Sequence, residues 1–134
     1  MSFGNISYCG LVQMRYLESI RQRMRDFAEA RDWDQFHSPK NLAMALSVEV
    51  SELVECFQWL TEEESRSLNA DQLSAIADEI ADIQLYLVRL ADKVGVEIDV
   101  AVEQKIVKND AKYPVEKVKG SSKKYTEYQQ GSDL

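Results

Sequence analysis

Residues 41–60 read N-L-A-M-A-L-S-V-E-V-S-E-L-V-E-C-F-Q-W-L and predict a helix that carries an acid inside its apolar face. At about 100° per residue, one narrow stripe of this helix contains Leu42, Leu46, Leu53 and Leu60. Glu49 falls in the middle of that stripe, Glu52 lies at its edge, and Glu55 points to the opposite side. A carboxylate on an apolar face is costly unless a partner neutralises it. The stretch therefore predicts a helix and a functional site together.

A second helix, expected over residues 70–94, repeats this arrangement. Its apolar stripe consists of Leu73, Ile76, Ile80, Ile83, Leu87 and Val94. Glu79, Asp82 and Tyr86 follow one another at i, i+3 and i+7 along the flank of the stripe, a spacing that places them on one side of a helix. The two helices thus carry the tetrapeptides E-V-S-E and E-I-A-D. If the helices pack face to face, four carboxylates converge.

The helix breakers delimit four helices, at about 11–30, 39–60, 70–94 and 99–112. Ser38 is a cap followed by Pro39 at the first helical position. Asn69 and Gln72 form a capping-box pair before the third helix, and Gly95 stops that helix. No convincing alternating strand pattern occurs. We therefore expect an all-α subunit that resembles a four-helix bundle.

The length of 134 residues corresponds to about one domain. We expect this domain over residues 1–114, because Tyr113 precedes Pro114 and the residue before a proline avoids the α region. Residues 115–134 are expected as a polar, mobile tail. The acidic segment 61–68 is expected as a loop between the second and third helices.

The composition excludes several classes of protein. With 16 Lys and Arg against 23 Asp and Glu, the net charge is −7, which disfavours binding to a nucleic-acid backbone. No apolar run approaches the length of about 20 residues that a membrane span needs, and no secretory signal is seen. Cys9 and Cys56 form neither a metal-type pair nor a disulfide framework. We expect a cytoplasmic protein without nucleic-acid or membrane partners.

Four converging acids indicate a hard divalent cation. Mg²⁺ takes oxygen ligands and commonly shares its coordination shell with substrate phosphates, and Mn²⁺ accepts similar ligands. A di-iron bundle would need a Glu-x-x-His motif on each of two helices, and the single histidine, His37, does not complete one. We therefore expect Glu49, Glu52, Glu79 and Asp82 to hold Mg²⁺ or Mn²⁺ and to act in catalysis. The alternative is that these four acids lie on solvent-exposed helix faces and bind no metal.

Other side chains suit a nucleotide. Lys105, Asn109 and Lys112 lie close to one face of the fourth helix, where they could bind phosphates or simply form a solvated surface. Aromatic rings that could stack on a base, or else belong to a core or interface, occur near the helix ends and beside the acids. These candidate rings are Trp33, Trp59, Tyr86 and Tyr113.

Several longer motifs together resemble a known family. They are R-D-W-D-Q-F-H-S-P-K-N-L (31–42), E-V-S-E-L-V-E-C-F-Q-W (49–59), D-E-I-A-D-I-Q-L-Y-L (78–87), K-N-D-A-K-Y-P (108–114) and S-S-K-K-Y-T-E (121–127). Across most of its length, the chain resembles the all-α nucleoside triphosphate pyrophosphatases of the MazG-like group. The resemblance implies hydrolysis between the α- and β-phosphates of a nucleotide, which gives a monophosphate and pyrophosphate. It implies house-cleaning of the nucleotide pool, with dCTP or a related deoxynucleoside triphosphate as substrate.

The resemblance also implies roles for the candidate residues. It assigns metal binding to the four acids, and it places Trp33, Trp59 and Tyr86 around the base and sugar. Residues expected near the phosphates are Lys105, Asn109, Lys112 and Tyr113, with His37 close by. The resemblance further implies a homodimer or homotetramer whose active sites use more than one chain.

A second observation also indicates that copies of the chain associate. The helix expected over residues 70–94 carries Ala81, Leu85 and Val88 away from its main apolar stripe. A helix that is apolar on nearly all sides is buried on nearly all sides, and a chain of this length struggles to achieve that alone. Two other functions stay open at this point. One is a catalytically quiet nucleotide sensor, and the other is an acidic helical interaction module.

Overall fold

The computed structural model describes residues 8–123 and residue 126, and every regular element in this part of the chain is helical. The elements are α1 (Tyr8–Ala30), the 3-10 helix η1 (Asp34–Phe36), α2 (Pro39–Glu55), α3 (Glu62–Ser65), α4 (Ala70–Val94), α5 (Ile98–Lys112) and α6 (Val115–Val118). The predicted all-α class is confirmed. No described helix is long and apolar enough to span a membrane.

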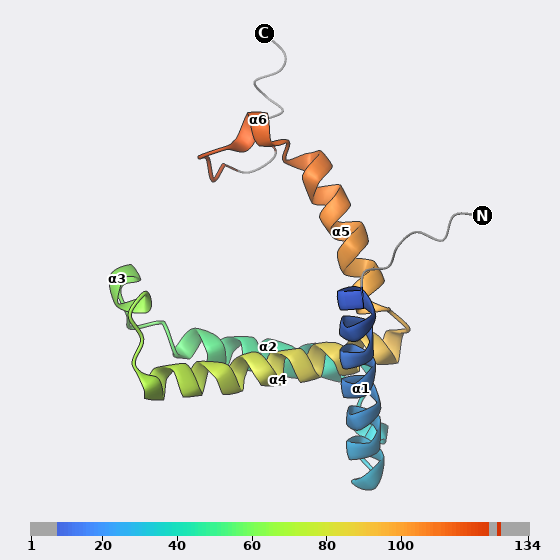
Figure 1. Cartoon of the computed structure of the whole chain (residues 1–134). Coiled ribbons are helices and arrows are strands. Elements are labelled where there is room, and N and C mark those ends of the chain that lie inside the picture. Colours follow the sequence, from blue (N-terminus) through green and yellow to red (C-terminus); the bar gives the residue numbers. More distant parts are fainter. Residues whose placement is uncertain (1–7, 124–125, 127–134) are drawn as a thin grey trace, which may run out of the picture. The chain divides into compact units, whose positions relative to one another are not determined.

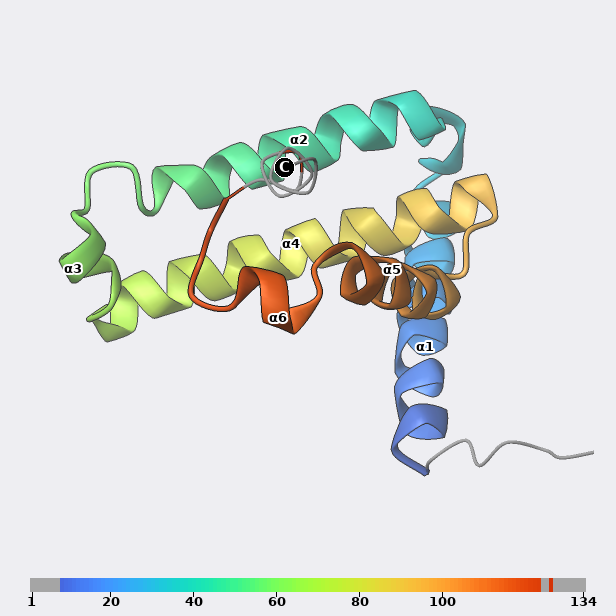
Figure 2. The same cartoon turned by 90° about the horizontal axis from the view of Figure 1, so that it is seen from above.

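The chain divides into two compact units, Met1–Val96 and Glu97–Leu134, which are described separately. In the first unit α2 and α4 run side by side, as two views show (Figures 1 and 2), and α1 crosses α4 near the C-terminal end of α4. The buried apolar residues are Ile20, Ala28, Leu42, Ile76, Val88 and Ala91. Leu42, from the predicted leucine stripe, is fully buried, and burial of a leucine contributes roughly 1.5–3 kcal/mol.

The predicted helix ends of α2 and α4 have the expected caps. The Ser38 hydroxyl accepts a hydrogen bond from the Asn41 backbone N–H at 3.2 Å. The side chains of Asn69 and Gln72 accept from each other's backbone N–H groups, both at 2.9 Å, which forms a capping box. Gly95 follows α4 with a φ of 73°, a left-handed conformation that glycine adopts without steric cost.

The expectation that the second helix continues to Leu60 is wrong, because α2 ends at Glu55. The backbone tightens from this point: the Cys56 N–H bonds to the Leu53 carbonyl at 3.2 Å as well as to the Glu52 carbonyl at 3.4 Å. Residues 56–59 form turns with similar short-range bonds. The helical spacing of apolar residues up to Leu60 therefore does not require a helix, because a turn can place apolar side chains on the same face.

The segment predicted as a loop contains the short helix α3. Thr61 and Glu64 form a capping box, in which the Thr61 hydroxyl accepts from the Glu64 N–H at 3.2 Å and the Glu64 carboxylate accepts from the Thr61 N–H at 2.8 Å. These bonds to the carboxylate lower the pKa of Glu64 below its usual value. The T-x-x-E signature was present in the sequence and was missed.

The second unit contains α5 and α6. The helix α5 ends at Lys112, as predicted, and Tyr113 leaves the helical conformation before Pro114. The expected tail begins with α6, and its residues 124–125 and 127–134 lie outside the described part of the chain. The division into a domain over 1–114 and a tail stays a prediction.

An ion network fastens α1 and η1 to α4. Its centre is Arg89, a buried side chain that pairs with Asp34 of η1 and with Asp92 one turn further along α4. Arg25 of α1 also donates to Asp92, through Nε at 2.8 Å, and Lys93 lies 2.6 Å from the Asp34 carboxylate. These hydrogen bonds and charges lower the pKa of Asp34 and of Asp92. The network therefore sets where the segment before α2 lies.

We expect Asn69→Ala to reduce the free energy of unfolding by about 1 kcal/mol, the usual contribution of an N-cap side chain. The substitution leaves the Gln72 backbone N–H without its side-chain acceptor. Urea unfolding followed by circular dichroism measures the change. Ser74→Ala, at an exposed position inside the same helix, is the control and should stay within about 0.5 kcal/mol of the parent. Equal effects of the two substitutions would refute the capping argument.

Candidate functional site

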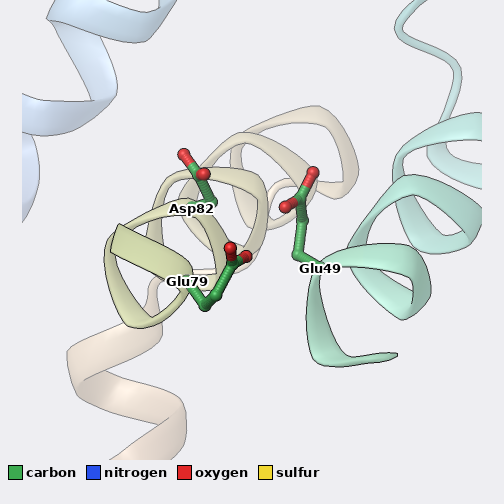
Figure 3. Close-up of side chains that lie close together, drawn as sticks. All are labelled: Glu49, Glu79 and Asp82. Carbon is green, nitrogen blue, oxygen red and sulfur yellow. The ribbon is translucent and has the colours of Figure 1, made fainter. Parts of the chain in front are cut away.

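Three of the four predicted acids meet between α2 and α4. Figure 3 shows Glu49 on α2 pointing toward Glu79 and Asp82 on α4. Each of the three offers a carboxylate oxygen, and these oxygens all lie within 4.8 Å of one another. Glu49 and Glu79 are half-buried, and Asp82 is exposed. The face-to-face packing expected from the sequence therefore brings these acids together.

Glu52, the fourth predicted acid, lies beside this group and not within its closest cluster. Its side chain hydrogen-bonds with that of Glu49, one turn earlier on α2, and its charge acts on Glu79 across the helix pair. The side chain of Glu52 is more exposed than that of Glu49. The E-x-x-E and E-x-x-D tetrapeptides thus form one acidic cluster, which we call the carboxylate cluster: Glu49, Glu52, Glu79 and Asp82.

Two acids of the carboxylate cluster, Glu49 and Glu79, have raised pKa values. Burial is the main cause of the raised pKa of Glu49, and the bond to Glu52 and the charges of Glu52, Asp82 and Glu79 raise it further. Burial also raises the pKa of Glu79, and the charges of Glu52 and Asp82 add to it. Both effects disfavour the charged form. A bound cation would remove both penalties.

The donor set of the cluster fits a hard divalent cation. All its ligand atoms are carboxylate oxygens, which such cations prefer. The buried oxygen Oε2 of Glu79 has no hydrogen-bond partner among the described residues, although buried polar atoms nearly always have one. A cation between α2 and α4 would satisfy this atom. The geometry therefore supports a metal site and leaves the identity of the ion open.

Three of the four predicted aromatic residues lie on several elements of the first unit. Trp33 precedes η1, is about half exposed, and packs edge-on against Phe27 with 5.8 Å between ring centroids. Tyr86 lies on α4 one turn after Asp82 and is half-buried. The side chain of Trp59, in the turn after α2, is 87% exposed. None of these three rings is a core residue, so all of them are accessible to a ligand.

The predicted phosphate-binding residues belong to the second unit. Lys105, Asn109 and Lys112 lie on α5 and are exposed, and the Lys112 ammonium group lies 5.6 Å from the centre of the Tyr113 ring. His37 belongs to the first unit, where it follows η1 and is half-buried. The roles of these residues toward a nucleotide stay predictions.

Arg89 is the important residue that the sequence argument missed. It follows Tyr86 by three residues on α4, and its Nε donates to His37 Nδ1 at 3.2 Å. The only local signal is the i, i+3 spacing to Asp92, which is common on solvated helices. Its contacts with Asp34 and His37 span more than 50 residues of sequence, so only the folded chain reveals them.

Comparisons with known proteins agree with this geometry. A family model described as the MazG-like family matches residues 44–128. Human dCTP pyrophosphatase 1 is 42% identical over 118 residues, which cover 87% of this chain and 69% of that protein. Mouse dCTP pyrophosphatase 1 is 41% identical over the same length and coverage. A crystal structure of a pyrophosphatase from Archaeoglobus fulgidus matches with a TM-score of 0.70 and 37% identity, covering 74% of this chain and 93% of that one.

The raised pKa values predict an unusual dependence of stability on pH. The pKa values of Glu49 and Glu79 lie above 4.5 in the folded chain, so these two acids stabilise the metal-free fold as the pH falls from neutral toward 4.5. The lowered pKa of His37 acts in the opposite direction below pH 6.5. In His37→Gln, which removes the opposing contribution of the histidine, we expect the melting temperature to rise over this range in EDTA. In MgCl₂ it should be higher at neutral pH, and the gain should shrink as protons displace the cation. Scanning fluorimetry measures both effects.

Glu79→Gln is the informative variant for this experiment. A neutral amide should raise the melting temperature of the metal-free protein at neutral pH and weaken its response to Mg²⁺. Glu63→Gln changes an exposed acid on α3 and should behave like the parent. A melting temperature that falls steadily from neutral pH toward pH 4.5, with no response to Mg²⁺, would contradict the metal site. Below pH 3.8 a fall is expected in any case, because Asp34 and Asp92 then lose their ion pairs.

Proposed function

Because the chain belongs to the MazG-like family and is a nucleoside triphosphate pyrophosphatase, we propose that it converts dCTP or a related deoxynucleoside triphosphate to the monophosphate and pyrophosphate with Mg²⁺. The relatives named dCTP pyrophosphatase 1 support this substrate class. The observation that carries the proposal is the carboxylate cluster between α2 and α4. We place the enzyme in the cytoplasm, where it would cleanse the nucleotide pool.

The carboxylate cluster would serve both the metal and the attacking water. When bound, Mg²⁺ would supply positive charge beside the phosphate oxygens. Oxygens of Glu49, Glu52, Glu79 and Asp82 would hold it. A carboxylate of the pair Glu49 and Glu52 orients the water and accepts its proton while the water oxygen attacks the α-phosphorus. The bond from the α-phosphorus to the bridging oxygen breaks, and pyrophosphate leaves with the electron pair of that bond.

The remaining predicted residues would bind the two ends of the substrate. The accessible rings of Trp33, Trp59 and Tyr86 suit the base and sugar, because a planar base stacks on an exposed aromatic face. The cations on α5 suit the leaving pyrophosphate, whose growing charge they would stabilise. This second set consists of Lys105, Asn109, Lys112 and Tyr113, and His37 completes the substrate-binding residues.

We also propose a homo-oligomer, a homodimer or homotetramer with shared active sites, in which a second copy covers α4. Apolar residues of this helix alternate at spacings of three and four, the repeat typical of helices that pack along a seam: Leu73, Ile76, Ile80, Ile83, Leu87, Leu90 and Val94. Every second residue of this series is exposed: Leu73, Ile80, Leu87 and Val94 are 40–55% exposed. Such a stripe on a single chain favours an identical partner helix.

A pyrophosphate-release assay tests the reaction. We expect Mg²⁺-dependent release of pyrophosphate and monophosphate from dCTP or another of the four deoxynucleoside triphosphates, and none in EDTA. Glu49→Gln and Asp82→Asn should be folded but at least about 100-fold slower, because each removes a charge from the site that stabilises the transition state. The rate with saturating Mg²⁺ is the readout, and circular dichroism checks the fold.

Glu29→Gln, at an exposed position on α1, is the matched control and should keep the parent rate. Full turnover by Glu49→Gln or Asp82→Asn would remove that residue from the catalytic machinery. If the parent binds a nucleotide with Mg²⁺ but releases no pyrophosphate from any of the substrates, the chain is a sensor. If neither metal nor nucleotide changes its melting temperature, the acidic interaction module is the correct function.

Ile80→Lys tests the assembly. A lysine in the centre of the exposed stripe would bury an ammonium group at the proposed contact, so we expect a lower oligomeric state by light scattering after size-exclusion chromatography. Ser74→Lys adds the same charge at an exposed position of α4 outside the stripe and should leave the mass unchanged. A parent protein that elutes as a monomer at micromolar concentration would overturn the proposed assembly.

A further inference from the structure

Arg89 makes an unusual set of contacts for a buried arginine. Its side chain is 4% exposed, and each arm of the guanidinium group has a different partner. Nη1 donates to Asp92 at 3.2 Å, Nη2 donates to Asp34, and Nε donates to Nδ1 of His37 at 3.2 Å. Two of these partners are carboxylates, which are normal for arginine. The third partner is a neutral imidazole nitrogen, which stabilises the guanidinium charge less than a carboxylate does.

The bond to His37 determines where its proton lies. A guanidinium group only donates hydrogen bonds, so the Nδ1 atom that it reaches must carry a lone pair. A neutral imidazole then has its proton on Nε2 and can donate from that atom alone. Burial and the positive charges of Arg89 and Lys93 lower the pKa of His37, while the Asp34 charge acts in the opposite direction. Arg89 thus holds one protonation state of the ring.

The position of Arg89 on α4 connects His37 to the carboxylate cluster. Glu79, Asp82, Tyr86 and Arg89 follow one another at spacings of three, four and three, so they line one side of the helix. Arg89 lies seven residues beyond Asp82, about 10 Å along the helix axis. A nucleotide whose phosphates lie at the acids and which extends over Tyr86 would place its nucleoside part near His37. This placement differs from the position beside the phosphates that the family resemblance implies for His37. Trp33 lies four residues before His37, at the other end of η1.

We propose that Arg89 is a positioning residue that holds His37 as the neutral Nε2–H tautomer, so that the imidazole donates a hydrogen bond to the nucleoside part of the substrate. This role rests on the proposed function, since it takes the nucleotide as the ligand. The alternative is that Arg89 only joins η1 to α4. Each acidic partner of Arg89 also has a second cation, because Asp34 pairs with Lys93 and Asp92 pairs with Arg25. Neutralising these two acids therefore does not require Arg89, which argues against a purely structural role. Among the described residues, the hydrogen bond to His37 is the contact of Arg89 that no other cation duplicates.

The single histidine of the chain makes the tautomer directly observable. In tag-free, ¹⁵N-labelled protein without nucleotide, long-range ¹H–¹⁵N spectra distinguish a protonated ring nitrogen from one with a lone pair. We expect the parent to show Nε2–H and an unprotonated Nδ1 at neutral pH. In Arg89→Met the two tautomers should mix, and the pKa of His37 should rise toward its usual value. The groups that act on this ring are Arg89, Lys93 and Asp34, and the last two remain in the variant.

Kinetics then tests the link to the substrate. We expect Arg89→Met to raise the KM for dCTP about tenfold, the equivalent of one hydrogen bond, with kcat changed less than about threefold. His37→Gln places an amide N–H near the position of Nε2 and needs no tautomer. The double variant should therefore have a KM less than about threefold above that of His37→Gln alone. Such non-additivity is typical of residues that act together.

Two controls separate this role from general stability. Arg89→Lys keeps a charge for Asp34 or Asp92 but lacks the three-armed geometry, so it should restore the melting temperature and not the tautomer or KM. Arg66→Met removes an arginine that also pairs with two carboxylates, on the exposed surface beside α3, and should keep the parent KM.

Three results would overturn the proposal: an unchanged His37 spectrum in folded Arg89→Met or Arg89→Lys, an unchanged KM in those variants, or additive effects with His37→Gln. If the parent releases no pyrophosphate, the proposed function fails separately. The non-hydrolysable α,β-methylene analogue of dCTP then replaces the substrate. A shift of the Nε2–H signal on binding, with about tenfold weaker binding by Arg89→Met, would uphold the role of Arg89, and no shift would refute it.

Discussion

Repulsion between carboxylates is the constraint on which the first unit depends. The apolar contacts of α2 and α4, with Leu42 and Ile76 in the core, bring Glu49 against Glu79 and Asp82. This packing raises the pKa of Glu49 and of Glu79, and it leaves one buried oxygen of Glu79 without a hydrogen-bond partner among the described residues. A fold that maintains such an arrangement gives up stability in its metal-free state. The same arrangement prepares a cation site, because the ligands are already assembled before the cation arrives.

The opposite electrostatic arrangement occurs further along α4. There the acids are fully paired: Arg25, Arg89 and Lys93 surround Asp34 and Asp92, and the pKa values of both acids fall. One helix therefore carries an unsatisfied acidic cluster in its middle and a satisfied ion network near its end. The first can bind a cation, whereas the second joins η1 to α4 through the pair of Arg89 and Asp34. A site that must hold a metal and orient a nucleoside needs both kinds of environment, one open to a ligand and one closed.

The apolar surface of α4 connects the site to the proposed assembly. The side of the helix that carries Glu79, Asp82 and Tyr86 adjoins the stripe that contains Ile80 and Leu87. A second copy on that stripe would lie close to the carboxylate cluster, so association and catalysis would not be independent. Such proximity would give a physical reason for the proposed sharing of active sites between chains. The proposed association would also explain why large apolar side chains of α4 are exposed in a single chain.

The sequence by itself determined the helical class, the capped ends of α2 and α4 and the four acids, because period, caps and i, i+3 spacing are local properties. The apolar spacing extends the predicted α2 to Leu60, since an apolar period does not distinguish a helix from a turn that packs on the same face. The helix α3 lies in an acidic segment without an apolar period, where the T-x-x-E cap is its only local signal. Only the tertiary structure decided that Glu49, Glu79 and Asp82 meet within 4.8 Å and that Arg89 reaches His37. Both results join residues far apart in the chain, and no local pattern specifies which sides of two helices will face each other.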